Sequence, residues 1–252
     1  MGGDSSVPRF FIGNENAKDG KITVTGEDAR HISLSLRARV GEEYVLCDEN
    51  GTEYLSKIEK IDSKSVSFEV LKEKQSLSEP SVGVFLCQAL VKGDKFDEIV
   101  QKAVELGVSG IVPVISSRCV SKPDGKTLEK KVERWNKIAK AAAMQCDRAK
   151  VPAVENALTY KKALERIKEC GCGFVCYEST PHVPLKEIFD AKKGAKTYGF
   201  FIGPEGGLSE DEAELAKDFG IPLASLGKRI LRTETAPVCV LSAIMFYSGN
   251  MD

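Results

Sequence analysis

The stretch "FFIGPEGGLSEDE" (residues 200–212) places an apolar run, a loop with three glycines and the start of an acidic helix in direct succession. The apolar run is typical of a strand buried in a parallel sheet. Ser209 and Glu212 form the S-x-x-E pattern of a helix N-terminus. Loops of this kind commonly bind phosphate on backbone N–H groups. Glu205 at the centre of the loop repels phosphate, so the stretch predicts either a stiff structural turn or a site for a ligand without phosphate.

The chain around this stretch alternates between strand-like and helical segments. Strand-like runs occupy residues 82–90, 110–116, 171–177, 197–203 and 222–227, and the longest helical patterns between them cover residues 94–107 and 127–146. This alternation predicts an α/β domain over residues 80–252, with a parallel sheet that carries helices on both faces.

Residues 1–75 have a different pattern, in which short strand-like runs at 43–48, 52–61 and 65–73 are separated by turns. Residues 28–41 lie before these runs and are predicted to contain a short helix. The polar stretch 72–80 ends in Pro80 and has the composition of a linker. The sequence therefore predicts a small β domain over residues 1–75, followed by the α/β domain.

The composition excludes several classes of protein. Lys and Arg number 36 against 37 Asp and Glu, which argues against general coating of nucleic acid and against a membrane-surface protein. The longest apolar stretch, residues 236–247, falls short of the ~18 residues that a membrane span needs. Eight cysteines without a Cys-x-x-Cys pair, and only two histidines, predict a cytoplasmic protein with reduced thiols and no metal site.

One local excess of positive charge stands out against this balance. Residues 118–150 contain ten basic and four acidic side chains. This segment predicts either a surface that follows nucleic-acid phosphates or a solvated helix face.

A second loop, "SLGKRILRTETAP" (residues 225–237), resembles the first because it also joins an expected strand to an expected helix. Gly227 ends the strand, and Thr235 precedes a helix whose first turn tolerates Pro237. Ligands of parallel sheets collect at the carboxyl ends of the strands, where both loops lie. Open backbone with Glu205 and Glu234 suits a ligand that has hydroxyl groups, an adenine and a positive centre. S-adenosylmethionine carries these groups and no phosphate.

Several segments together are similar to a known family. The runs "KGDKFDEIVQKAVELGVSGIVPVISSRC", "ERWNKIAKAAAMQCDRAKVP", "FIGPEGGLSEDE" and "LGKRILRTETA" resemble the RsmE-type ribosomal RNA methyltransferases of the SPOUT superfamily. The N-terminal "VPRFF" and "HISLSLRARVG" fit the small PUA-like β-barrel domain of that family. The resemblance covers nearly the whole chain.

The resemblance implies a C-terminal trefoil knot, a homodimer and S-adenosylmethionine as the cofactor. It implies methylation of N3 of one uridine in 16S ribosomal RNA, presented as RNA or as the small ribosomal subunit. The implied cofactor-binding residues are Gly203, Pro204, Glu205, Gly206, Leu226, Gly227, Ile230, Leu231, Arg232, Thr233, Thr235 and Ala236. The predicted RNA-binding residues are Arg9, Arg30, Arg37 and Arg148.

The predicted catalytic residues are Arg232 and Glu234. Arg232 is assigned to the charge of the deprotonated uracil. The proton acceptor stays open between Glu205, Glu234 and water. The chain also departs from a Glu-Gln-Ser run found in family members, because it has Met144, Gln145 and Cys146 there.

Two other classes compete with a methyltransferase. The first is a non-catalytic RNA-binding protein that carries a degenerate methyltransferase domain, against which the intact loop motifs argue. The second is an enzyme that binds a phosphate-bearing nucleotide, which Glu205 and the missing G-x-x-x-x-G-K-[ST] motif oppose.

Overall fold

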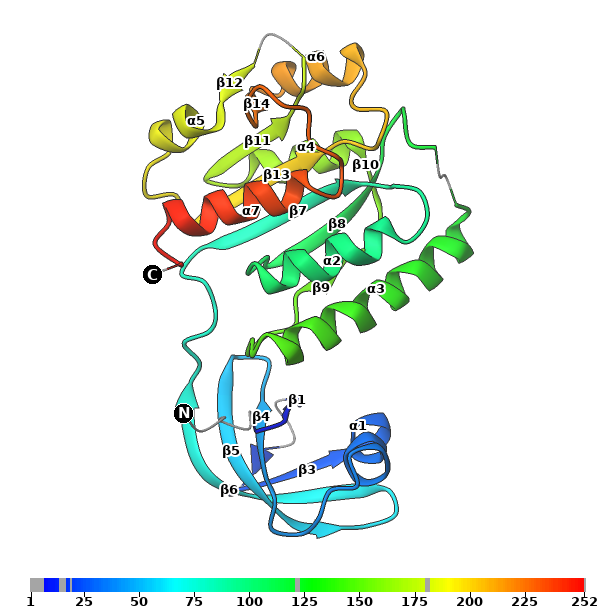
Figure 1. The fold of residues 1–252 in the computed structure, drawn as a ribbon, viewed down its shortest axis with the longest axis vertical. Helices are drawn as coiled ribbons and strands as arrows, with labels where there is room; N and C mark the ends of the chain where they lie inside the picture. Colours follow the sequence, from blue (N-terminus) through cyan, green and yellow to red (C-terminus); the bar gives the residue numbers. More distant parts are fainter. Residues whose placement is uncertain (1–6, 14–16, 19, 121–122, 180–181, 252) are drawn as a thin grey trace. The chain divides into compact units, whose positions relative to one another are not determined.

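The structure is a computed structural model that describes residues 7–13, 17–18, 20–120, 123–179 and 182–251 (Figure 1). The chain divides into two compact units. The N-terminal unit comprises Met1–Glu79 together with Ala143–Val151, and the C-terminal unit comprises Pro80–Ala142 together with Pro152–Asp252. Each unit is described by itself below.

The N-terminal unit is built on one six-stranded sheet with the order β1-β4-β5-β6-β3-β2. Its strands are β1 (Arg9–Phe11), β2 (Ala17–Lys18), β3 (Lys21–Thr25), β4 (Glu43–Cys47), β5 (Thr52–Ile61) and β6 (Ser65–Gln75). The three strand-like runs predicted here are confirmed as β4, β5 and β6. The pairs are antiparallel except β1 with β4, which is parallel.

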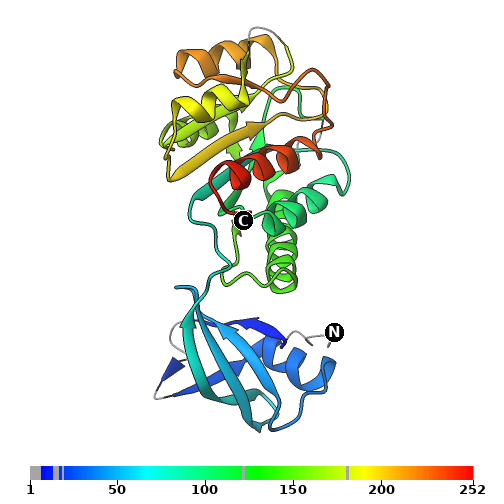
Figure 2. The same cartoon turned by 60° about the vertical axis from the view of Figure 1, so that its left-hand side comes forward.

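This sheet is curled but open within the described residues, with β1 and β2 at its two edges (Figure 2). The predicted barrel is therefore a half-barrel. Irregular pairing in β5 and β6 bends the sheet around a core that includes Phe10, Tyr44 and Phe68. Tyr44 lies between the other two rings, with ring centroids 6.0 Å from Phe10 and 5.8 Å from Phe68.

The helix expected within residues 28–41 is present in its first half. Helix α1 (Gly26–Arg30) continues into a π-helical turn, η2 (His31–Ser35), and buries Ala29 and Ile32. The helical conformation ends before Arg37, whose φ of 52° lies in the left-handed region.

The C-terminal unit contains the predicted parallel sheet. Its strands follow the order β10-β8-β7-β13-β11-β14-β12, with β9 beside β8, and all of its pairs are parallel. The strands are β7 (Gly83–Ala89), β8 (Gly110–Ile115), β9 (Ala153–Val154), β10 (Leu158–Thr159), β11 (Cys172–Cys176), β12 (Val183–Pro184), β13 (Thr197–Ile202) and β14 (Leu223–Ser225). Phe174, Phe200 and Phe201 fill the sheet's interior and are fully buried.

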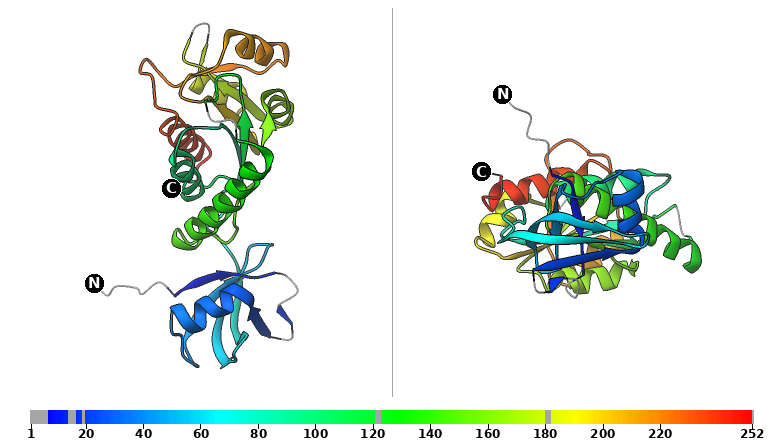
Figure 3. Two further views of the ribbon diagram at one scale, coloured as in Figure 1. Left: turned by 90° about the vertical axis from the view of Figure 1, so that its right-hand side faces the viewer. Right: turned by 90° about the horizontal axis from the view of Figure 1, so that it is seen from below.

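Helices cover both faces of this sheet. They are α2 (Lys95–Glu105), α3 (Gly125–Gln145), α4 (Tyr160–Lys168), α5 (Leu185–Ala191), α6 (Glu210–Asp218) and α7 (Ala236–Tyr247). In Figure 1, α2 and α7 lie in front of the sheet and contact each other, and α4 lies behind it and contacts α6. Figure 3 shows α3 as one long unbroken helix, whose last turn belongs to the N-terminal unit.

Periodicity predicted the buried face of α2, and the structure confirms it. Phe96, which begins this face, stacks on Trp135 of α3 with ring centroids 4.0 Å apart. The indole Nε1–H of Trp135 donates to Asp97 over 3.0 Å, which satisfies the polar end of the ring. None of the helices in the described residues combines the length and apolar character that crossing a membrane requires.

Candidate functional site

Three neighbouring strands of the C-terminal unit end at one cavity of about 430 Å³. β11 lies between β13 and β14 in the sheet, and the residues that follow each of these strands line the cavity. The volume falls within the range of ~300–1,000 Å³ that is usual for sites of small ligands. The position agrees with the expectation that ligands collect at the carboxyl ends of parallel strands.

The two loops singled out in the sequence form most of the cavity wall. The predicted site residues that line it are Gly203, Pro204, Glu205, Gly206, Leu226, Gly227, Ile230, Leu231, Arg232, Thr233, Glu234 and Ala236. Thr235 is not among the lining residues. It is the N-cap residue of α7, but its side chain makes no capping hydrogen bond.

A buried hydroxyl group joins the two loops. Thr233 Oγ1 donates to the carbonyl oxygen of Gly203 over 2.7 Å and accepts from Gln88 Nε2 over 3.2 Å. Gln88 is fully buried near the end of β7. The second loop is therefore hydrogen-bonded both to the first loop and to the sheet.

The conformation of the first loop depends on its glycines and on its helix cap. Gly207 has φ +66°, and a Cβ on Gly203 would lie 2.9 Å from Leu208 Cδ1. The predicted capping box is confirmed, because Ser209 and Glu212 bond each other's backbone N–H groups at the start of α6. Glu212 also accepts from the Ser117 backbone N–H over 2.8 Å, which ties this helix start to the loop after β8.

Two acidic side chains of the cavity, one from each loop, meet at a single lysine. Lys95 Nζ lies 3.5 Å from Glu205 Oε1 and 3.6 Å from Glu234 Oε2. Burial alone would raise the pKa of the Glu205 carboxyl. Hydrogen bonds from backbone N–H groups, including that of Lys92, and the charge of Lys95 outweigh burial and hold this pKa below its ordinary value.

Arg232 is placed differently from these two carboxylates. Its side chain is exposed at the cavity, and among the described residues it has no ion-pair partner. A guanidinium group in this position can donate to a negatively charged ligand atom without first breaking an ion pair.

Several cavity residues were not predicted from the sequence. Cys176, Tyr177 and Glu178, which end or follow β11, line the cavity. Lys95, the first residue of α2, is not a lining residue but contacts the carboxylates of Glu205 and Glu234. Ligands of parallel sheets bind after the carboxyl ends of the strands, and "FVCYE" (residues 174–178) is such a strand end. These residues could therefore have been predicted from the sequence as part of the site. No such pattern marks Lys95, because its approach to both carboxylates depends on packing between distant segments.

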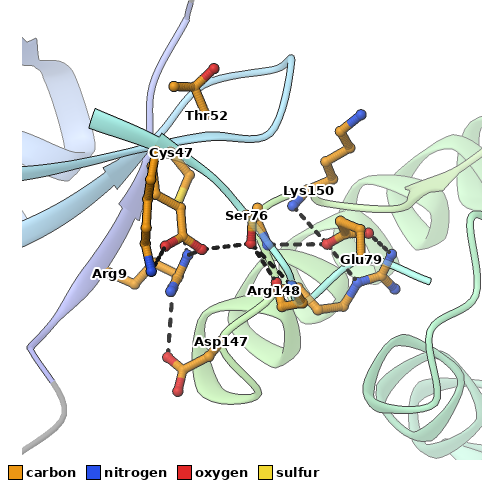
Figure 4. Close-up of polar contacts among 12 residues, drawn as sticks. Arg9, Cys47, Thr52, Ser76, Glu79, Asp147, Arg148 and Lys150 are labelled. Atoms are coloured by element: carbon orange, nitrogen blue, oxygen red, sulfur yellow. Dashed lines mark hydrogen bonds and ion pairs between the residues drawn. The ribbon is translucent and has the colours of Figure 1, made fainter. Parts of the chain in front are cut away.

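Two of the predicted RNA-binding arginines are engaged inside the N-terminal unit (Figure 4). Arg9 Nη1 donates to Glu53 over 3.0 Å and to the Cys47 Sγ over 2.9 Å, and the Arg9 side chain is only 9% exposed. Burial raises the pKa of the Cys47 thiol to about 11, so Cys47 accepts this bond as a neutral thiol.

Arg148 is the second engaged arginine. Its Nη2 lies 2.6 Å from Glu79 Oε2, and its side chain is 6% exposed. Glu79 also accepts from the backbone N–H groups of Ala149 and Lys150, at 3.0 and 3.1 Å. RNA contact by Arg9 and Arg148 stays a prediction, and it requires these buried ion pairs to open.

The other two predicted arginines are exposed. Arg30 ends α1 and Arg37 follows η2, and the side chains of Leu34 and Leu36 between them are 73% and 44% exposed. In the basic segment 118–150, the side chains of Lys126, Lys130 and Lys137 are among those that are exposed. Arg134 pairs with Asp94 and Asp97, and Lys122 lies outside the described residues.

No group of three or more histidine, cysteine, aspartate or glutamate side chains in the described ranges is arranged to hold a metal ion. The polar side chains singled out in this cavity are the carboxylates of Glu205 and Glu234 and the exposed guanidinium of Arg232, all of which belong to its two loops.

Comparisons with known proteins identify related domains in both units. Residues 78–245 match the RNA methyltransferase domain family, and residues 24–71 match the RNA methyltransferase PUA domain family. The chain is 36% identical over 230 residues to the ribosomal RNA small subunit methyltransferase E of Bacillus subtilis, covering 89% of this chain and 90% of that protein. It is 31% identical to the protein of the same name from Mesomycoplasma hyopneumoniae, covering 93% and 97% of the two chains.

A solved structure extends this likeness to three dimensions. The crystal structure of a ribosomal RNA small subunit methyltransferase E from Neisseria gonorrhoeae, bound to S-adenosyl methionine, superposes with a TM-score of 0.85. The two sequences are 32% identical, and the match covers 95% of this chain and 97% of the other.

Proposed function

Since the chain belongs to the RsmE family of ribosomal RNA small subunit methyltransferases, we propose that it methylates N3 of a specific uridine in 16S ribosomal RNA with S-adenosylmethionine. The observation that carries this proposal is the single cavity formed by the two loops after β13 and β14. The solved relative from Neisseria gonorrhoeae, which is bound to S-adenosyl methionine, supports the identity of the cofactor.

The cavity residues fit this cofactor. Gly203, Gly206 and Gly207 line the cavity without side chains, so a ligand can approach this backbone closely, which suits recognition of an adenine edge. The carbonyl oxygens of Gly203 and Gly206 already accept hydrogen bonds from Thr233 and Arg118. The carboxylates of the cavity suit hydroxyl groups and positive charge, while they disfavour a phosphate. We assign cofactor binding to the lining residues of both loops and include Thr235, which immediately precedes α7.

The reaction needs a nucleophilic N3, because the neutral imide of uracil is a poor nucleophile. S-adenosylmethionine supplies an electrophilic methyl group on a sulfonium sulfur. Arg232 stabilises the negative charge that deprotonation places on the uracil oxygens, as preorganised donors do in other enzymes. We assign the role of proton acceptor to Glu234, whose carboxylate belongs to the same loop as Arg232 and lines the same cavity.

The N-terminal unit supplies RNA contacts in this proposal. Arg30 and Arg37 are exposed beside the apolar side chains of Leu34 and Leu36. Such a surface combines charge for phosphates with apolar groups for unstacked bases. The target uridine must leave its stack before N3 can be reached.

We further propose that the protein is cytoplasmic and homodimeric, and that the chain around β14 and α7 forms a trefoil knot. The open face of α7 supports the dimer, because Phe246 on this apolar helix is 76% exposed and Cys239 is exposed on the same face. Replacement of Phe246 by Glu should convert a dimer to monomers in analytical ultracentrifugation, and a wild-type monomer would exclude this arrangement.

Mass mapping of 16S ribosomal RNA tests the function directly. Cells that lack the protein should have one unmethylated uridine, and the wild-type gene should restore the mark. At a saturating concentration of S-adenosylmethionine, the Arg232→Ala variant should lose about 10²–10³-fold in single-turnover methylation, the usual effect of removing such a donor. Identical modification maps with and without the gene would reject the proposed function.

A further inference from the structure

Glu178 lies between the two loops of the cavity. It follows β11, the strand that separates β13 from β14 in the sheet, and it lines the same cavity as the loops. The two predicted loops do not include it, and none of the roles assigned above uses it.

The backbone of the first loop leaves room for the Glu178 carboxylate. A Cβ built on Gly207 would lie 2.0 Å from Glu178 Oε1, so any side chain at position 207 would displace this oxygen. The φ of +66° at Gly207 also disfavours other residues. The glycine therefore allows the carboxylate to lie against the first loop.

The charge of Glu178 is not compensated by the protein. Glu205 and Glu234 share Lys95, whereas no hydrogen-bond donor or cation within the described part of the chain pairs with Glu178. The cations that line the cavity, Lys228, Arg229 and Arg232, all belong to the second loop. The wall formed by β11 and the first loop thus offers an exposed carboxylate without a partner among the described residues, while the cations of the same cavity come from the second loop.

We propose that Glu178 binds the ammonium group of the methionine portion of S-adenosylmethionine. This inference rests on the proposed function and adds a residue to its site. An ammonium group offers three N–H donors and keeps its charge throughout the reaction, so a carboxylate can hold it in a charge-assisted hydrogen bond at every stage. The sulfonium offers no donor and loses its charge during transfer, so a carboxylate beside it would stabilise the ground state more than the transition state.

Calorimetric titration of Glu178→Gln with three ligands tests this assignment. S-adenosylmethionine and S-adenosylhomocysteine both carry the ammonium group, and each should bind about tenfold more weakly than to the wild type. 5′-Methylthioadenosine lacks the amino-acid portion and should bind equally to both proteins. Glu165→Gln, at an exposed position of α4 outside the cavity, is the matched control and should bind all three ligands as the wild type does.

Every other result contradicts the assignment, and these results can be told apart from one another. If Glu178→Gln binds all three ligands as the wild type does, Glu178 does not contact the cofactor. If the variant loses as much affinity for 5′-methylthioadenosine as for the other two ligands, Glu178 acts on the nucleoside portion or on the conformation of the loop. A loss confined to S-adenosylmethionine would place the carboxylate at the sulfonium. Failure of the wild type itself to bind S-adenosylmethionine would reject the proposed function as well, whereas wild-type binding with an unaffected variant rejects only this inference.

Discussion

The hydroxyl group of Thr233 donates a hydrogen bond of 2.7 Å to the carbonyl oxygen of Gly203, a residue 30 positions earlier in the chain. This bond joins the loops after β13 and β14 at the cavity that they share. Thr233 is itself held by Gln88 of β7, so the position of one loop relative to the other is fixed by buried polar groups. Such a bond makes the cavity wall rigid before a ligand arrives.

Replacement of Thr233 by Val should separate the two loops while it preserves the shape of the side chain. The carbonyl oxygen of Gly203 and the amide of Gln88 each lose a partner, at a cost of about 1–3 kcal/mol. We expect the dissociation constant for S-adenosylmethionine, measured by calorimetry, to rise about tenfold. Thr23→Val, at an exposed position of β3 in the N-terminal unit, is the control and should bind the cofactor as the wild type does. Equal affinities of the two variants would show that this bond does not shape the site.

Replacement of Glu79 by Gln should destabilise the N-terminal unit. The change removes the negative charge that faces the buried Arg148, and breaking a buried ion pair from one side commonly costs about 3 kcal/mol. Urea denaturation should show this loss as a lower midpoint for the variant. Glu73→Gln, at an exposed position of β6, should leave the midpoint unchanged. Two indistinguishable variants would mean that the Glu79–Arg148 pair contributes nothing to stability.

Glu53 should make the stability of the N-terminal unit depend on acidic pH. Burial alone would raise the pKa of its carboxyl, but hydrogen bonds from Ser76, Arg9 and Lys74 outweigh burial, so the pKa lies below the ordinary 4.5. A carboxyl whose pKa is lowered on folding stabilises the fold above its unfolded pKa, and this contribution disappears as the pH falls through the folded value.

The free energy of unfolding of the wild type should therefore decrease as the pH drops below about 4.5. In Glu53→Gln this decrease should be shallower, because the titrating group is gone. Glu42→Gln, a change at an exposed position, should retain the wild-type slope. The same slope in all three proteins between pH 5 and pH 3 would contradict the role of Glu53.

Simultaneous replacement of Arg30 and Arg37 by Ala should weaken RNA binding. Each phosphate contact that is lost reduces the slope of log K against log salt by about one unit on duplex and somewhat less on single strands. We expect a lower affinity for a 16S ribosomal RNA fragment in filter binding, and a flatter salt dependence, with no change in S-adenosylmethionine affinity. Lys64→Ala, in the turn between β5 and β6, is the control. A salt slope like that of the wild type would place the RNA on another surface.

The features that were predictable from the sequence are those set by local pattern. The apolar period of residues 94–107 gave the buried face of α2, and Ser209 with Glu212 gave the start of α6, because both depend on neighbours within one or two turns. The loops of the site were found because strand ends and glycines mark them in the sequence.

The features that the sequence did not reveal depend on contacts between distant segments. Arg9 matched the expectation for an RNA contact, yet Glu53, far along the chain, engages it. Lys95 meets Glu205 and Glu234 only after three segments have packed together. The extent to which the N-terminal sheet closes was also not readable from the sequence. In the described residues β1 and β2 form its two edges, and edges are set by strand pairing, which local alternation does not determine.

The central claim is that the two loops joined by Thr233 and Gly203 enclose S-adenosylmethionine. A crystal structure of the protein soaked with this cofactor tests the claim most directly. We predict electron density for the adenine and ribose in the cavity between residues 203–207 and 226–236. Well-defined density for the cofactor at any other place on the protein would contradict the account.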